Sequence, residues 1–249
     1  VSGADSYVLY YGANASINTS NSHVSGVTSP YGFTNANIRA GAYYYFALTA
    51  VNDAGQSELS EIKRMAVLIP QTGQTTSYAD GDDGDLGEGA TWPATRFIDN
   101  GDGTVTDTLT GLMWQKNPNV IPKSNWSSSL SLCDSSAVAS YTDWRMPNLR
   151  EMLSLIDYYY YSLAVDTTAF PLLDGDDTIY WTSTSNIADG DYAWCVDLDT
   201  GETAAANKTL NSYWVWAVRD DIGTAKAEIA RTGQSASLVD YDDGYYDQG

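Results

Sequence analysis

The chain has 249 residues, enough for one large domain or two ordinary ones. It carries 32 acidic and 12 basic residues, for a formal net charge of −20, and all but six of the acids are Asp. Such a surface repels nucleic acid and anionic lipid, because their phosphates need Lys and Arg for neutralisation. We therefore expect no nucleic-acid partner, and no membrane insertion in this segment, since no stretch has the roughly 20 apolar residues of a membrane span.

Residues 1–69 read as successive strands with polar connections. In the strand around Tyr45, this residue shares one face with Ala47 and Thr49. The runs SGADSYVLYYG and AYYYFALTAVNDAGQSELS resemble strands of a fibronectin type III domain. The resemblance implies a partial β-sandwich without its first two strands: either the chain is a piece of a longer one, or another chain supplies strands, which is a route to fibres. The predicted strands are Tyr7–Tyr11, Tyr31–Asn35, Tyr43–Asn52 and Glu58–Val67.

A Gly, Asp and Thr segment, TGQTTSYADGDDGDLGEG, occupies residues 72–89. It returns as TGQSASLVDYDDGYYDQG at residues 232–249, with nine of eighteen positions identical at an offset of 160 residues. An offset of this size is one domain length. We therefore interpret residues 223–249 as a linker followed either by the start of a second copy or by a segment that docks where the first copy docks.

Residues 70–222 have the pattern of one α+β domain with two helices. The first helix is predicted over Ser124–Ala139, with Ser124 or Asn125 as its cap. The second begins where Asn148 and Glu151 have the spacing of a capping box. The strands predicted in this domain are a hairpin within Arg96–Trp114, then Thr178–Ser183, Tyr192–Asp197 and Ser212–Arg219, with Gly201 at a positive φ in the turn after the third.

Five sequences occur in this order: RFIDNGDGTVTDTLTGLMWQK, DWRMPNLREMLSLID, YWTSTS, YAWCVDLDTGE and SYWVWAVR. Over Thr72–Arg219 they resemble the Lcl C-terminal domain family of secreted or surface prokaryotic modules. The resemblance implies a C-type-lectin-like fold related to formylglycine-generating enzymes. Some relatives bind sulfated polysaccharide, but here the late strands offer few basic residues, such as Lys208 and Arg219. The expected fold class is thus mostly β with an α+β main domain: a partial fibronectin-III-like sandwich followed by a C-type-lectin-like domain with two helices.

Side chains for enzymatic chemistry are scarce, and we assign no catalytic residue. The one histidine, His23, lies outside the main domain, so hydrolase triads and zinc sites built on His are not expected there. Cys133 and Cys195 permit one disulfide, and two buried free thiols are the alternative. We expect Arg145 to pair with a carboxylate and Glu151 to cap its own helix.

The acidic loops are candidate calcium sites, because calcium prefers six to eight oxygen ligands. The candidate ligands are Asp80, Asp82, Asp83 and Asp85 in one loop, and Asp99 and Asp102 in another. The alternative interpretation is that these aspartates only form turns. No cofactor is required by this sequence, and calcium is an option.

A ligand surface is expected on the late strands and their loops. Aromatic faces beside Asn and Asp suit sugars or a protein partner, whereas Trp181 and Trp194 are expected in the core. The candidates are Asp191, Asn207, Asn211, Tyr213 and Trp214. We expect an extracellular or cell-surface, non-enzymatic protein for adhesion or filament assembly, which exchanges strands or segments with other copies of itself. The alternative is a lectin-like module that binds a cell-surface glycan or protein.

Overall fold

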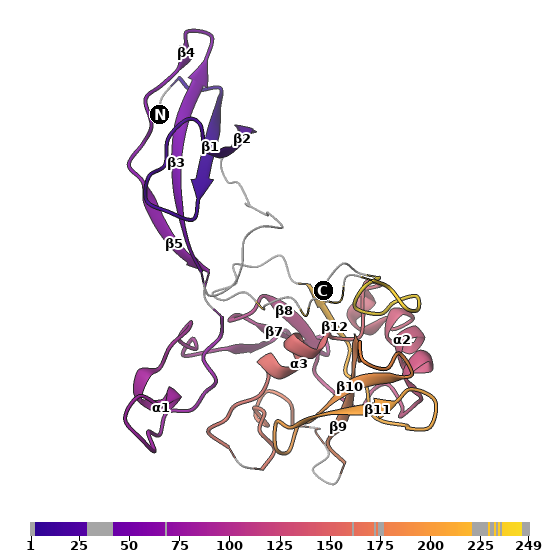
Figure 1. The fold of residues 1–249 in the computed structure, drawn as a ribbon. Helices are drawn as coiled ribbons and strands as arrows, with labels where there is room; N and C mark the ends of the chain where they lie inside the picture. The colour runs from indigo at the N-terminus through magenta and orange to yellow at the C-terminus, as the bar shows by residue number, and fades with distance from the viewer. Residues whose placement is uncertain are drawn as a thin grey trace. The chain divides into compact units, whose positions relative to one another are not determined.

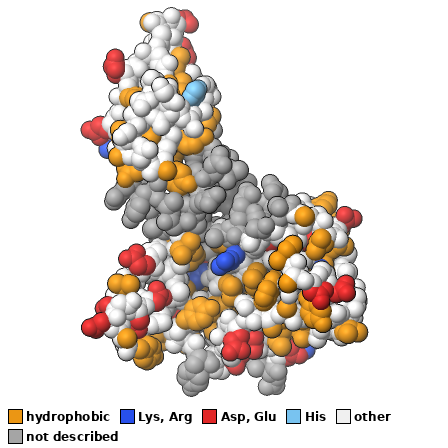
Figure 2. All heavy atoms as spheres, in the orientation of Figure 1, with side chains coloured by type: hydrophobic (Ala, Val, Ile, Leu, Met, Phe, Trp, Pro, Cys, Tyr) orange, Lys and Arg blue, Asp and Glu red, His pale blue; other side chains and the backbone are white. Residues whose placement is uncertain are grey.

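The computed structural model describes residues 3–28, 42–67, 69–160, 162–171, 173, 177–220, 229, 232, 234 and 236–245. The chain forms two compact units, Val1–Ile69 and Pro70–Gly249, which we call the N-terminal and C-terminal units (Figure 1). On the face drawn in Figure 2, acidic side chains are scattered over both units and basic ones are few. None of the helices in the described part of the chain has the length and apolar character needed to cross a bilayer.

The N-terminal unit contains one antiparallel sheet in its described residues. The strand order is β2-β1-β3-β4, and β5 pairs with β3. Ala47 and Thr49 on β3 are buried and Tyr45 packs against the same cluster, so the face predicted to carry these three residues lies toward the core of this unit. The strands are β1 (Ser6–Gly12), β2 (Ser22–Val27), β3 (Ala42–Asn52), β4 (Gly55–Gln56) and β5 (Lys63–Val67).

The strands of this unit differ from the prediction at two points. The last strand begins at Lys63 and not at Glu58, because Ser57 and Ser60 accept hydrogen bonds from β3 amides with their side-chain hydroxyls (both 2.9 Å). These hydroxyls take the place of the ladder that a strand would form there. The strand β2 was not predicted, and the predicted strand Tyr31–Asn35 lies outside the described residues.

The C-terminal unit contains two antiparallel sheets in its described residues. One has the order β11-β10-β9 and the other β12-β8-β7-β6. With the sheet of the N-terminal unit and only short helices, the chain has the expected β-rich α+β fold. The strands are β6 (Phe97–Asp99), β7 (Thr104–Asp107), β8 (Leu112–Gln115), β9 (Ile179–Ser185), β10 (Tyr192–Asp197), β11 (Thr203–Asn207) and β12 (Val218–Asp220). The helices are α1 (Asp83–Leu86), α2 (Trp126–Asp134), the 3-10 turn Val138–Ser140 and α3 (Leu149–Ser154).

Aromatic residues build the core of this unit. Trp216 lies edge-on to Phe170 and to Trp114, with ring centroids 4.6 and 5.3 Å apart, and all three are fully buried. Burial of one large apolar side chain stabilises a fold by about 1.5 to 3 kcal/mol. Trp181 is buried as predicted, but Trp194 is only partly buried, because it lies on the face of β10 opposite to Cys195.

The helix ends and the last strand differ from their predictions. Asn125 caps α2, which stops at Asp134, and Ala139, predicted to be helical, has a φ of 54°. The capping box of Asn148 and Glu151 on α3 is confirmed. The predicted strand Ser212–Arg219 is reduced to β12, because Tyr213 and Trp214 form single bridges to Ser124 and Tyr180 instead of a ladder.

Candidate functional site

The repeated segment occurs twice in the C-terminal unit. We call residues 72–89 the first Asp loop and residues 232–249 the second Asp loop, of which residues 232, 234 and 236–245 are described. The first loop contains α1, and the second follows β12. In Figure 1, α1 and the yellow C-terminal loop lie at opposite sides of this unit, the latter beside α2.

The first Asp loop folds around its own aspartates. Asp82 accepts hydrogen bonds from the backbone N–H groups of Tyr78 (2.7 Å) and Asp85 (2.8 Å). Thr72 Oγ1 donates to Asp83 Oδ2. Because backbone donors satisfy the charged form of a carboxylate, the bond from Tyr78 above all lowers the pKa of Asp82.

The second Asp loop repeats this arrangement residue by residue. Asp242 accepts hydrogen bonds from the backbone N–H groups of Leu238 (2.8 Å) and Tyr245 (2.9 Å). Thr232 Oγ1 donates to Asp243 Oδ2. Each of these residues lies 160 positions after its counterpart in the first loop.

The conserved spacing extends to a glutamine and a glycine in each loop. Gln74 Nε2 and Gln234 Nε2 donate to the central aspartate of their own loop, at 3.4 and 3.0 Å. A Cβ added at Gly84 or Gly244 would lie 2.2 or 2.3 Å from a backbone carbonyl oxygen of the same loop. Such a contact requires glycine, so the identical glutamine, aspartate and glycine of each segment help to close its loop.

The two loops differ in what lies against them. The second loop is seated on the end of β9: Asp243 N–H donates to Ser183 O (3.2 Å), and Thr184 Oγ1 donates to Asp243 Oδ2 (2.8 Å). Ser185 N–H donates to Gln234 Oε1 (2.7 Å). Asp243 is fully buried at this contact with β9. The end of β9 thus forms a binding site for one copy of the segment.

A buried ion pair holds the start of α3, which in turn contacts the end of β9. Thr184 Oγ1 also accepts a hydrogen bond from Leu149 N–H (3.0 Å) at the start of α3. The same helix start is fixed by Glu151, which forms a bidentate pair with Arg145 (2.7 and 2.8 Å). Arg145 also reaches Asp220 Oδ1 (2.8 Å) on β12. The pairing predicted for Arg145 is confirmed, and it ties α3, β12 and the docking strand together.

Asp243 is electrostatically unusual at this contact. Its Oδ1 is buried and finds no donor among the described residues, and the same holds for Ser183 Oγ. Burial raises the pKa of Asp243, while the hydroxyls of Thr232 and Thr184 oppose this rise. The protonation of one carboxyl is therefore coupled to the seating of the second loop.

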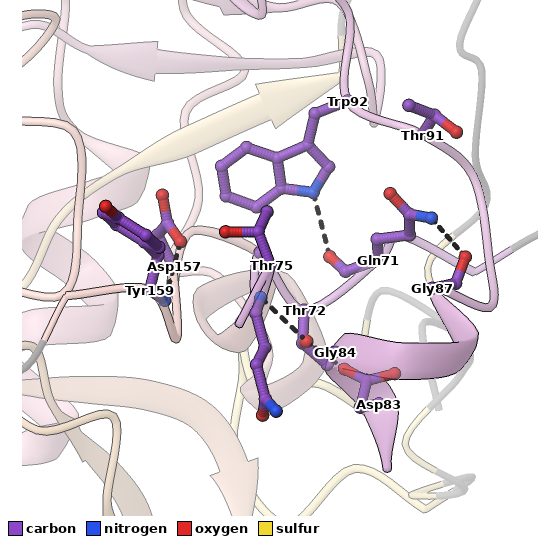
Figure 3. A pocket seen from close by; sticks show the side chains of 12 residues that line it. Gln71, Thr72, Thr75, Asp83, Gly84, Gly87, Thr91, Trp92, Asp157 and Tyr159 are labelled. Atoms are coloured by element: carbon purple, nitrogen blue, oxygen red, sulfur yellow. Dashed lines mark hydrogen bonds between the residues drawn. The ribbon is translucent and has the colours of Figure 1, made fainter. Parts of the chain in front are cut away.

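The matching side of the first Asp loop opens into a cavity of about 650 Å³ (Figure 3). Trp92 Nε1 donates to Gln71 O (2.9 Å) at its edge, and burial raises the pKa of Asp157. In this view Trp92 lies above Thr75, and Asp157 lies to its left beside Tyr159. Residues of the loop and of the adjacent chain line this space: Gln71, Thr72, Gly73, Gln74, Thr75, Asp83, Gly84, Gly87, Thr91, Trp92, Asp157 and Tyr159.

Five of the six candidate calcium ligands accept hydrogen bonds from the chain itself. Asp85 accepts from Gly81 N–H (2.8 Å) and Asp102 from Thr104 N–H (3.0 Å). The Lys116 side chain lies 2.6 Å from Asp99 and lowers its pKa. Asp82 and Asp83 are engaged within the first Asp loop, and Asp80 lies at its tip. Within the described ranges no three His, Cys, Asp or Glu side chains are grouped so as to hold a metal ion, and calcium stays a prediction.

The candidate ligand residues of the late strands are joined through the backbone. Lys208 N–H donates to Asp191 O (2.9 Å), and Asn211 N–H donates to Asn207 O (3.2 Å). Asn211 Nδ2 also donates to the Tyr213 hydroxyl (3.0 Å). The structure thus brings these residues onto neighbouring turns, while the partly buried Trp214 lies with its ring under the Lys123 ammonium, 5.0 Å from the centroid. Ligand binding by this surface stays a prediction.

The two cysteines are buried free thiols, and no disulfide links them. Both belong to one apolar cluster with Trp126 and Trp144. Burial raises the pKa of Cys195 to about 11 and raises that of Cys133 still further. Thiols with such pKa values are protonated and poor nucleophiles at neutral pH. Their role in the fold is to fill the core.

Comparison with known families finds a match within the C-terminal unit. Residues 103–219 match the model of the Lcl C-terminal domain family. The Lcl segment, as we call these residues, spans β7 to β12 and includes the β9 end, while both Asp loops lie outside it. The match begins later than the resemblance seen from Thr72. Comparison with curated proteins finds no match.

The docking residues of β9 were not singled out from the sequence. Ser183, Thr184 and Ser185 read as an ordinary strand end, and nothing in WTSTS specifies a partner. The available signal was the repeat itself, but the expected docking of both copies at one place is not seen in the described residues: the second Asp loop contacts the end of β9, and the first lies at the opposite side of the unit. The repeat identified the second Asp loop, but not the residues of β9 that it contacts.

Proposed function

We propose that this chain is an extracellular, non-enzymatic surface protein that assembles with copies of itself. In this proposal the Lcl segment is the part of the chain that binds Asp loops. One observation carries the proposal: the β9 end of the Lcl segment binds the second Asp loop through Ser183, Thr184 and Ser185. The chain thus contains both a repeated segment and a site for it. A protein with both parts has the means to join copies of one module.

The chemistry of the described residues supports a structural role. The thiols are buried with raised pKa values, and the Arg145–Glu151 pair anchors a helix. His23 lies exposed on β2 of the N-terminal unit, where its ring contacts Asn21 O (3.2 Å). The high negative charge of the chain favours solubility outside the cell over binding to phosphate-bearing partners.

Electron microscopy of native material, labelled with an antibody against this chain, tests the proposal. We expect the label along extended assemblies at or outside the cell surface, at a regular repeat. Mass spectrometry of the intact chain from the same material identifies the subunit. Label on dispersed single particles only, with a monodisperse monomer in the extract at high concentration, contradicts the proposal.

A further inference from the structure

The cavity beside the first Asp loop corresponds to the space that β9 occupies beside the second. In the second loop, the side that contacts β9 is formed by Thr232, Gln234 and Asp243. Their counterparts Thr72, Gln74 and Asp83 line the cavity of about 650 Å³. One molecule therefore contains the same contact side twice, once filled by a strand end and once open.

We propose that the open side of the first Asp loop binds the Ser183–Ser185 end of β9 from a second copy of this chain. The hydrogen bonds are those of the second loop. Asp83 Oδ2 accepts from the hydroxyl of the partner's Thr184, and Gln74 Oε1 accepts from the backbone N–H of the partner's Ser185. Asp83 N–H donates to the carbonyl of the partner's Ser183, since the first N–H groups of a helix have no acceptor within it.

The two surfaces are complementary in hydrogen bonding. The cavity offers acceptors, the carboxylates of Asp83 and Asp157 and the amide oxygen of Gln74, beside the apolar faces of Trp92 and Tyr159. The β9 end offers a hydroxyl and a backbone N–H, and the Lys208 ammonium lies beside it, 2.7 Å from Ser185 Oγ. Hydrogen bonds to a charged acceptor are stronger than those between neutral groups. An acidic peptide would be repelled here, whereas a Ser/Thr strand end fits.

The second Asp loop competes for the same strand end. It is tethered to the Lcl segment, and a tethered ligand has an effective concentration on the order of millimolar. At low protein concentration each chain is therefore closed by its own second loop. Association with a second copy requires that this loop leaves, and the first Asp loop of the other chain takes its place.

This exchange defines the geometry of the assembly, and it rests on the proposed assembly role. The first Asp loop and the β9 end are different surfaces, so the contact is head-to-tail. A head-to-tail contact that does not close on itself generates an open filament. Each added copy presents one open Asp loop and one β9 end for the next.

Release of the second loop tests the proposal. In the full chain, Gly244→Ala places a Cβ 2.3 Å from the Ala236 carbonyl oxygen and opens that loop. We expect the apparent dissociation constant of self-association to fall by about tenfold or more, equivalent to about 1.4 kcal/mol. Sedimentation velocity over a concentration series measures it, and circular dichroism shows that each variant is folded.

Two matched variants show whether the association uses the proposed contact. Adding Gly84→Ala, whose Cβ meets the Thr76 carbonyl oxygen at 2.2 Å, damages the other copy of the loop in the same way and should restore the monomer. Asp83→Asn does so without adding a Cβ, if Gly84→Ala fails to fold. Thr184→Val also releases the second loop, but it removes the hydroxyl of the strand end, so it should release the loop without association.

Each outcome decides the proposal. The proposal is supported if Gly244→Ala associates, if adding Gly84→Ala or Asp83→Asn abolishes that association, and if Thr184→Val does not associate. Equal association of Gly244→Ala and the double variant overturns it, while the assembly role proposed above stands through another contact. If Gly244→Ala remains as monomeric as the unaltered chain, the proposal is wrong. If native material is dispersed as well, the assembly role falls with it.

Discussion

The two Asp loops make the same internal hydrogen bonds but have different surroundings. Asp82 and Asp242 each accept bonds from two backbone N–H groups at equivalent positions. Asp242 and Asp243 are fully buried, whereas Asp82 and Asp83 are partly exposed. The comparison separates two functions of one sequence: Asp82, Asp242 and the glycines Gly84 and Gly244 close their loops, and contact with β9 buries the second copy.

Loss of the ion pair between Arg145 and Glu151 should have the largest effect. It should disturb the surroundings of the second Asp loop and leave the first unchanged. Glu151→Ala leaves the buried Arg145 without its bidentate partner, and such a break costs about 3 to 5 kcal/mol. Denaturant unfolding of the full chain, followed by tryptophan fluorescence, should show this loss in the transition of the C-terminal unit. The second Asp loop should lose its seat, while the first retains its internal hydrogen bonds.

Glu202→Ala is the matched control, because Glu202 is exposed at the turn between β10 and β11. It should leave the unfolding free energy nearly unchanged. A loss of equal size in both variants would mean that Glu151 has no special role beneath the docking strand.

The effect of pH on docking of the second Asp loop should be smaller, and it should distinguish Asp243 from its counterpart Asp83. Burial raises the pKa of Asp243 above its ordinary value of 3.8, so the docked state binds a proton more tightly than the released one. Docking should therefore strengthen as the pH falls from neutral through the raised pKa, with no further gain below the ordinary value. Asp243→Asn should remove this part of the pH dependence, and Asp83→Asn should retain it. Denaturant midpoints at a series of pH values measure the difference.

A docking strength in the unaltered chain that is constant, or that falls, as the pH is lowered from neutral to the ordinary value of 3.8 would contradict this assignment. The same conclusion would follow if Asp243→Asn and the unaltered chain had parallel pH profiles.

Local signals in the sequence predicted much of the C-terminal unit. The capping box of Asn148 and Glu151 and the strand Tyr192–Asp197 appear at the expected residues, and Gly201 has a positive φ of 76°. Each depends on neighbours within a few positions. The strand Ser212–Arg219 failed because its partners are distant: β12 pairs with β8, and Tyr213 and Trp214 make isolated bridges.

The candidate site was predicted only in part, for the same reason. The aspartates of both Asp loops were visible as a repeat, and the closing glycines Gly84 and Gly244 were among its identical positions. The contact of Asp243 with Thr184 is made across the fold and has no local signature. Calcium was inferred from acidic composition, whereas the hydrogen bonds to Asp82 show that the backbone of the loop uses this carboxylate.

Hydrogen exchange at the Ser185 amide tests the central claim most directly, because this N–H donates to Gln234 Oε1 of the seated second loop (2.7 Å). At low protein concentration we predict slow exchange in the unaltered chain and in Gly84→Ala, and fast exchange in Gly244→Ala. Equally fast exchange in the unaltered chain and Gly244→Ala would contradict the account, since the second Asp loop would then not occupy the end of β9.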